Sequence, residues 1–120
     1  NGNVMGYACK RDIAISPLAP HPQMVLTHEL AHVVLGHTEQ SFIADGETPT
    51  RSEREFEAEG TAFVFGNVFG LPGVDDSKAY VRGWGLKEIT AKMAAHVLSC
   101  VDKIIKAGLK EENSRGEMEN

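Results

Sequence analysis

Residues 28–32 constrain the fold more than any other segment, because they read His-Glu-Leu-Ala-His inside an apolar stretch. Apolar residues recur at helical spacing from about residue 23 to residue 37, and Pro22 stands where a helix start tolerates proline. Residues four apart lie on one face of a helix, so His28 and His32 should direct two imidazoles at one point, with Glu29 beside it. The segment therefore predicts a helix that holds a metal ion.

Two imidazoles and a neighbouring carboxylate suit zinc. Catalytic zinc sites use three protein ligands and leave the fourth position to a water whose pKa falls to about 7. The HExxH pattern fixes three of five positions and matches by chance in many chains, but here Leu30 and Ala31 are apolar and no proline interrupts the helix. We expect His28 and His32 as zinc ligands and Glu29 as the general base that takes a proton from the water.

The third ligand has to come from elsewhere, and His37 is the candidate nearest in sequence. The longer pattern HExxHxxGxxH would need Gly at position 35 and His at position 38, whereas the chain has Leu35, Gly36 and His37. Position 37 also projects well away from the face that holds the two histidines. Gly36 and His37 are therefore interpreted as the C-terminal cap of the helix.

A second helical pattern, over residues 51–71, supplies four glutamates. Thr50 and Glu53 are spaced as a capping box. Glu55 and Glu59 lie four residues apart at the edge of a small-residue stripe that allows close helix packing, while Glu57 points roughly the other way. The stripe consists of Ala58, Ala62 and Gly66. We expect Glu55 to complete the zinc site and Glu59 to hydrogen-bond a zinc-bound histidine, with Glu57 left open as the alternative ligand.

The remaining segments predict an α+β fold, with a small antiparallel sheet or hairpin packed on the HExxH helix and two further helices. Residues 4–16 suit a hairpin, whose edge at 12–16 could pair with an extended peptide. A short element is expected near residues 77–82, followed by an amphipathic helix that starts near residue 86 and ends near Gly108. We expect one domain over residues 1–110 and a polar, disordered tail over 111–120.

Composition limits the classes of protein to which the chain can belong. Its 120 residues are enough for one core, and its net charge of −5 disfavours duplex DNA as a direct partner. Cys9 and Cys100 lie far apart without metal-site spacing, which indicates two buried free thiols and a cytoplasmic location. Nothing reads as a signal peptide or a membrane span, and the start at Asn1 suggests a fragment of a longer protein.

Residues 28–37, together with residues 54–65, resemble the C-terminal metallopeptidase domain of ArdC-like antirestriction proteins and, more distantly, the ImmA/IrrE peptidases. The likeness covers roughly residues 6–105 and implies a zincin-like fold. In gluzincin-type enzymes the second helix carries Glu-x-x-x-Asp, so the resemblance assigns the ligand role to Glu55 and the supporting role to Glu59, with Glu where many relatives have Asp. ArdC-like proteins occur on mobile elements and bind single-stranded DNA through a separate domain.

The expected function is that of a zinc metallopeptidase that hydrolyses a peptide or protein substrate through a water activated by Glu29. Stabilisation of the oxyanion could come from zinc alone or with help from one of four side chains that each fit a structural role better, namely Tyr7, Tyr80, His21 and His96. A rival hypothesis is a non-proteolytic, zinc-stabilised accessory domain of a DNA-binding antirestriction protein. A metal-free helical interaction module is the third.

Overall fold

The computed structural model describes residues 6–9, 11–36, 50–85 and 88–119. These residues form an antiparallel sheet and four helices, in the order β1 (Gly6–Cys9), β2 (Asp12–Ile15), α1 (Pro22–Val34), α2 (Arg51–Phe69), α3 (Val74–Trp84) and α4 (Ala91–Glu119). The predicted α+β class, with a small antiparallel sheet on the histidine-bearing helix, is confirmed. Three helices accompany α1 where the sequence predicted two, because the short element expected near residues 77–82 is a complete helix, α3.

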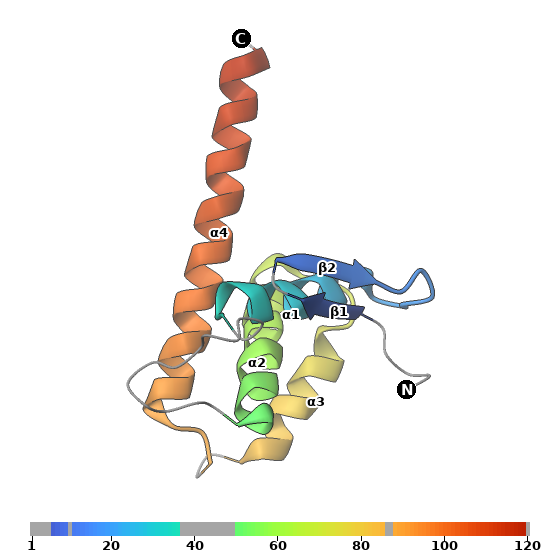
Figure 1. The fold of residues 1–120 in the computed structure, drawn as a ribbon, viewed down its shortest axis with the longest axis vertical. Helices are drawn as coiled ribbons and strands as arrows, with labels where there is room; N and C mark the ends of the chain where they lie inside the picture. The colour runs from blue at the N-terminus through green and yellow to red at the C-terminus, as the bar shows by residue number, and fades with distance from the viewer. Residues whose placement is uncertain (1–5, 10, 37–49, 86–87, 120) are drawn as a thin grey trace.

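The two strands form the predicted hairpin, and the hairpin lies against α1 (Figure 1). Gly6 pairs with Ile15 at one end of the ladder, and Cys9 pairs with Asp12 at the other. A side chain at Gly6 would place its Cβ 2.6 Å from Cγ1 of Val25, so only glycine lets β1 approach α1 this closely. The approach brings the start of β1 next to the site described below.

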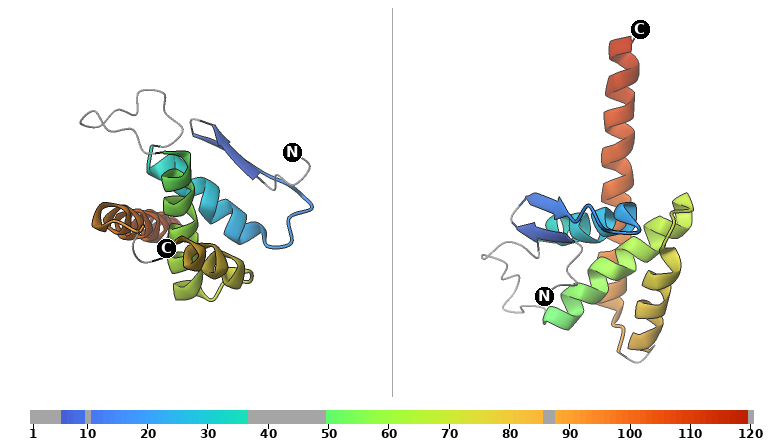
Figure 2. Two further views of the ribbon diagram at one scale, coloured as in Figure 1. Left: turned by 90° about the horizontal axis from the view of Figure 1, so that it is seen from below. Right: turned by 90° about the vertical axis from the view of Figure 1, so that its right-hand side faces the viewer.

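Helix α2 is the centre of the fold, since it contacts α1, α3 and α4 (Figure 2). The capping box predicted from Thr50 and Glu53 is present, with each side chain accepting a hydrogen bond from the backbone N–H of the other residue. The helix ends at Gly70, which adopts the left-handed conformation with φ of 63°. The start of α2 is therefore specified by local sequence, and its position by packing on three sides.

The predicted small-residue stripe forms the contact surface of α2. Ala58 and Ala62 are completely buried, and a Cβ on Gly66 would lie 2.9 Å from Sδ of Met24 in α1. Small side chains let the two helix axes come close, because ridges of larger residues would hold them apart. Glu55 of α2 can therefore reach the histidines of α1.

Two groups of buried side chains fill the interior between the helices. One joins α1, α2 and α4 through Ala31, Ala58 and Cys100. The other joins α2 and α4 through Phe56, Met93 and Val97, with Trp84 of α3 packed against it. Both thiols are free, and Cys100 is buried as expected, whereas Cys9 is exposed on the hairpin. The prediction of two buried thiols was therefore wrong for Cys9, because the outermost position of a two-stranded ladder has no layer above it.

The C-terminal ends of α1 and α4 differ from the limits expected from the sequence. Helix α1 stops at Val34, and its C-cap is Leu35 instead of the predicted Gly36 and His37. Gly36 follows the C-cap with φ of 76°, and His37 lies outside the described residues. Helix α4 continues to Glu119 instead of ending near Gly108, and it projects well beyond the other elements (Figure 1). A glycine inside a helix costs about 1 kcal/mol relative to alanine, which is too little to end a helix that continues into Leu, Lys and Glu. The domain limits of 1–110 and 111–120 stay a prediction.

None of the helices in the described ranges is both long enough and apolar enough to cross a membrane.

Candidate metal centre

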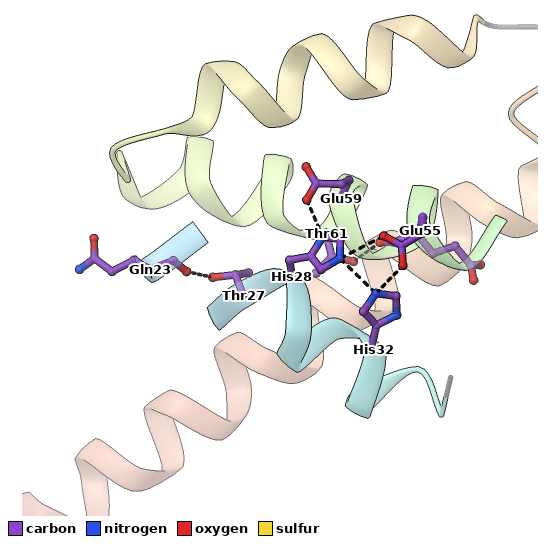
Figure 3. A network of polar contacts seen from close by, with 8 residues as sticks. Gln23, Thr27, His28, His32, Glu55, Glu59 and Thr61 are labelled. Atoms are coloured by element: carbon purple, nitrogen blue, oxygen red, sulfur yellow. Dashed lines mark hydrogen bonds and ion pairs between the residues drawn. The ribbon is translucent and has the colours of Figure 1, made fainter. Parts of the chain in front are cut away.

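Three side chains from two helices meet where α1 crosses α2 (Figure 3). The Nε2 atoms of His28 and His32 lie 3.1 Å apart on one face of α1. Glu55 of α2 approaches both rings, with Oε2 at 3.3 Å from Nε2 of His28 and Oε1 at 3.2 Å from Nε2 of His32. The structure thus brings together the two histidines and the carboxylate that the sequence predicted as ligands.

The spacing of these atoms is within a few tenths of an ångström of that around a tetrahedral zinc ion. Zinc binds imidazole nitrogen and carboxylate oxygen at about 2.0–2.2 Å, so two ligand atoms of a tetrahedral site are separated by about 3.3–3.6 Å. The three separations observed here are 3.1, 3.2 and 3.3 Å. Within the described residues, His28, His32 and Glu55 form the group of potential ligands whose atoms all lie within 4.8 Å of one another. One small cation with nitrogen and oxygen ligands could be held among them.

Glu59, one turn after Glu55, contacts the other side of His28. Its Oε1 lies 2.5 Å from Nδ1 of His28, so the Nδ1–H donates to the carboxylate (Figure 3). A neutral imidazole that is protonated at Nδ1 carries its lone pair on Nε2, the atom directed at Glu55 and His32. The supporting role expected for Glu59 therefore has the geometry that metal-binding histidines require.

The charges of the cluster shift the pKa values of its members in opposite directions. Burial alone would lower the pKa of His28, but hydrogen bonds to Glu55 and Glu59 outweigh it and raise the pKa to about 10. Hydrogen bonds from His28 and His32 hold the pKa of Glu55 far below its usual range. For Glu59, burial would raise the pKa, and hydrogen bonds from His28 and Ser77 lower it overall. Both carboxylates are thus kept ionised, as a cation site needs.

Glu57 points away from this cluster, as the helical spacing indicated. Its side chain is 3% exposed, and Oε2 contacts Nδ1 of His96 on α4. The Glu57 carboxylate lies on the face of α2 opposite Glu55 and Glu59, and its contact with His96 stabilises the packing of α4 on α2. The structure therefore brings Glu55, and not Glu57, to the two histidines.

Glu29 is buried with 9% of its surface exposed, and it shares a pocket with His28 and Glu55. Burial raises the pKa of its carboxyl above the usual value, and the nearby His28 and His32 oppose part of that rise. A carboxyl whose pKa is raised towards neutrality is suited to exchange protons with a reacting group. Glu29 thus has both the position and the environment of an acid or base beside the ligands.

The pocket measures about 490 Å³ and is open to solvent on the His28 side of the cluster. It is bounded by β1, by the loop before α1, by α1 itself, by the N-terminal half of α2 and by the first turn of α3. Besides His28, Glu29, Glu55 and Glu59, the lining comprises Gly6, Pro20, His21, Met24, Val25, Arg51, Gly73, Asp76 and Ser77. A space of this size accommodates several residues of an extended peptide or one small molecule.

The four side chains considered for oxyanion stabilisation have different positions. His21 lines the pocket, whereas His96 is paired with Glu57 on the far side of α2. Tyr80 lies on α3 without lining the pocket, and the side chain of Tyr7 is outside the described part of the structure. Of the described candidates, His21 is the one that a ligand in the pocket could contact.

Sequence reasoning missed Arg51 and Ser77. Arg51 precedes Glu55 by four residues, so its presence on the same face of α2 could have been found from helical spacing. Ser77 lies on α3, 18 residues after Glu59, and no local pattern links the two. Only the packing of α3 on α2 brings Ser77 to the pocket.

Comparison with known families gave a match over the part of the chain that carries the candidate ligands. A family model described as the IrrE N-terminal-like domain, peptidase M78, matches residues 2–65. Neither the comparison with curated proteins nor that with solved structures gave a significant match. The matched span includes His28, His32 and Glu55 and covers more than half of the 120 residues. The chain therefore belongs to the peptidase M78 family of IrrE N-terminal-like domains, which indicates a metallopeptidase-like domain.

Proposed function

We propose that the chain is a zinc-dependent metallopeptidase domain in which His28, His32 and Glu55 bind zinc and Glu29 is the general base. The observation that carries the proposal is the convergence of ligand atoms of His28, His32 and Glu55 within 4.8 Å, next to a pocket that His28, Glu55 and Glu29 line. Zinc dependence is typical of the M78 family. Bound zinc would act as a Lewis acid, which polarises a peptide carbonyl and acidifies water.

In this proposal the side chains around the zinc site have separate roles in the reaction. Glu59 accepts the Nδ1–H of His28, so the proton that His28 releases when a metal binds comes from Nε2. Glu29 accepts a proton from the attacking water on a carboxylate oxygen and returns it to the nitrogen of the leaving amine. Burial of Glu29 favours both steps, since its raised pKa brings the carboxyl closer to the operating pH. His21 and Arg51 lie on the pocket wall, where a positive charge or N–H donor can face the developing oxyanion.

Zinc stoichiometry is the first test of the proposal. Protein purified without added metal should contain close to one zinc per chain by elemental analysis. Glu55→Ala should lose the metal, and Glu57→Ala should keep it, since Glu57 faces α4 instead of the site. A zinc content near zero in the parent chain would rule out the metal centre, and loss of zinc only in Glu57→Ala would identify the other glutamate as the ligand.

Hydrolysis is tested with Glu29→Gln on a degenerate fluorogenic peptide library. The variant should retain zinc and lose cleavage by roughly a factor of 10² to 10⁴, the usual contribution of a general base. Glu88→Gln is the matched control, because Glu88 is exposed and does not line the pocket. Cleavage that survives in Glu29→Gln would refute the role of Glu29, and a zinc-loaded parent chain that cuts no peptide would refute the peptidase assignment.

The finer proposal is that the domain comes from an ArdC-like antirestriction protein of a mobile element. It is supported by the resemblance over residues 28–37 and 54–65, and the net charge of −5 agrees with DNA binding through a separate domain. The rival hypothesis is a zinc-stabilised accessory domain that cuts nothing. An antirestriction assay on the full-length protein with Glu29→Gln separates the two: loss of protection implicates proteolysis, and full protection favours the accessory domain.

A further inference from the structure

His21 is a pocket residue whose backbone is held in place. It is the N-cap of α1, with φ of −131°, and its carbonyl accepts hydrogen bonds from the backbone N–H groups of Met24 and Val25 at 3.1 and 3.2 Å. Pro22, the next residue, restricts His21 further, because the proline ring disfavours the helical conformation in the residue before it. The His21 side chain therefore extends from a segment with little freedom to move.

The ring of His21 packs on Gly73, the residue that precedes α3. A Cβ added at Gly73 would lie 2.5 Å from Cγ and 2.7 Å from Cδ2 of His21, and Gly73 itself has φ of 93°. Glycine accepts both the close approach and this backbone conformation. None of the residues in the described ranges forms a hydrogen bond or ion pair with the His21 ring. The imidazole is thus fixed through its carbon atoms, while its nitrogens can bond to a ligand in the pocket that it lines.

His21 and His28 lie on the same side of α1 but are not close together. Seven residues separate them, which is nearly two helical turns, so the two side chains are about 10 Å apart along the helix axis. Arg51, by contrast, is one turn, or about 6 Å, from Glu55 on α2. A carbonyl that reacts beside Glu55 is therefore nearer to Arg51 than to His21. A bound substrate would meet His21 with a part that lies further from the reacting bond.

The pocket wall between the metal centre and His21 is apolar and has few side chains. Met24 and Val25 of α1 line it, and Gly6 of β1 and Gly73 contribute only backbone. Glycine in a wall lets another backbone come close. An extended peptide advances about 3.3 Å per residue, so about 10 Å corresponds to three residues. This stretch of the pocket suits the main chain of an extended peptide that runs from the metal centre to His21.

We propose that His21 is a substrate-binding residue, whose imidazole hydrogen-bonds the main chain of an extended peptide about three residues away from the bond that is cut. The proposal deepens the proposed function and rests on it for the cleavage itself. A neutral imidazole offers one N–H donor and one acceptor nitrogen, which match the C=O and N–H of a peptide group. Because every peptide has the same main chain, this contact selects for the length of the substrate and not for its sequence.

The test compares His21→Ala with the parent chain on peptides of different length. The starting peptide is the one that the parent chain cleaves best in the fluorogenic library, and it is shortened one residue at a time from either end. On the full peptide, His21→Ala should raise KM by about 3- to 10-fold, the usual value of one hydrogen bond, and leave kcat nearly unchanged. In one of the two shortened series, the variant and the parent should have equal kcat/KM once fewer than about three residues remain beyond the cut.

Gln23→Ala is the matched control, since Gln23 is exposed, lies two residues after His21 and does not line the pocket. Gly73→Ala is a second variant, which keeps the imidazole but places a methyl group where its ring packs. It should show the same dependence on peptide length as His21→Ala. Zinc content and thermal unfolding of each variant separate this effect from a loss of metal or of the fold, and if Gly73→Ala unfolds, His21→Ala still decides. An equal loss on long and short peptides, or a loss in kcat instead of a rise in KM, would overturn the proposal.

A second readout depends on neither zinc nor cleavage. In the metal-free chain with ¹³C-labelled histidine, the ring signal of His21 is identified by its disappearance in His21→Ala. Titration with a degenerate hexapeptide library should shift this signal, and titration with a degenerate dipeptide mixture should not. A parent chain that binds zinc but cuts no peptide would refute the proposed function alone. A His21 signal that the hexapeptides leave unchanged would refute the role of His21.

Discussion

Replacement of Ala58 by leucine should disturb the fold and the metal centre together. Ala58 is completely buried where α1, α2 and α4 meet, with Ala31 and Cys100 as its buried neighbours. Leucine adds three carbons to a site without free space, and overpacking of this kind costs about 1–3 kcal/mol. The entropy of unfolding is about 2.1 cal/mol/K per residue, or about 250 cal/mol/K for this chain. The melting temperature should therefore fall by about 4–12 °C.

The same substitution should weaken zinc binding, because the leucine pushes α2 away from α1. Glu55 lies three residues before Ala58 and reaches the histidines only because the two helices pack closely. Functional groups must be held to within about 0.5 Å, so a displacement of this kind should lower zinc affinity by roughly tenfold or more.

Circular dichroism melts in chelator and zinc competition assays measure the two effects of Ala58→Leu separately. Ala95→Leu, at an exposed position of α4, is the matched control and should change neither quantity. An unchanged melting temperature in Ala58→Leu would refute the tight packing at this junction. A lower melting temperature with parental zinc affinity would refute the link between the junction and the site.

Three further substitutions or treatments test other contacts. His96→Ala removes a charge-assisted partner of the buried Glu57 and should lower the free energy of unfolding by about 1–3 kcal/mol, measured in urea, without changing zinc affinity. A thiol reagent at pH 8 should modify the exposed Cys9 quickly and Cys100 only after unfolding, since burial removes access and raises the pKa of the Cys100 thiol; equal rates would contradict the burial of Cys100. Thr50→Ala should cost about 1 kcal/mol through loss of the capping box, and an unchanged melting temperature would show that packing alone holds the start of α2.

Features set by local spacing could be predicted from the sequence. The hairpin, the start of α2 with its capping box, and the shared face of His28 and His32 each depend on residues within a few positions of one another. The choice of Glu55 over Glu57 also follows from helical spacing, because positions two apart on a helix point to nearly opposite sides. Each of these features could be predicted because the residues that form it are close together in the sequence.

Features set by packing between distant elements could not be predicted in this way. Nothing in the local sequence reveals that Ser77 lines the same pocket as Glu59 or that His96 meets Glu57, because each pair joins residues 18 to 39 positions apart on different helices. The length of α4 was missed for another reason, since Gly108 looks like a stop signal but its cost of about 1 kcal/mol is offset by the helix formers that follow it. Contacts between side chains on different helices can be identified only once the packing of the helices is known.

The glutamates of α2 show why stability and metal binding are linked in this chain. A run of alternating glutamates would ordinarily lie on a solvated face, yet Glu55 and Glu59 meet histidines of α1 while Glu57 meets a histidine of α4. Helix α2 is thus held between its neighbours by carboxylate–imidazole contacts on both sides as well as by small apolar residues. A cation bound between α1 and α2 would strengthen the contacts of Glu55 and Glu59 with the histidines of α1. The contact of Glu57 with His96 of α4 would not change. Zinc should therefore stabilise the packing of α1 on α2, while the contact between α2 and α4 persists in the metal-free chain.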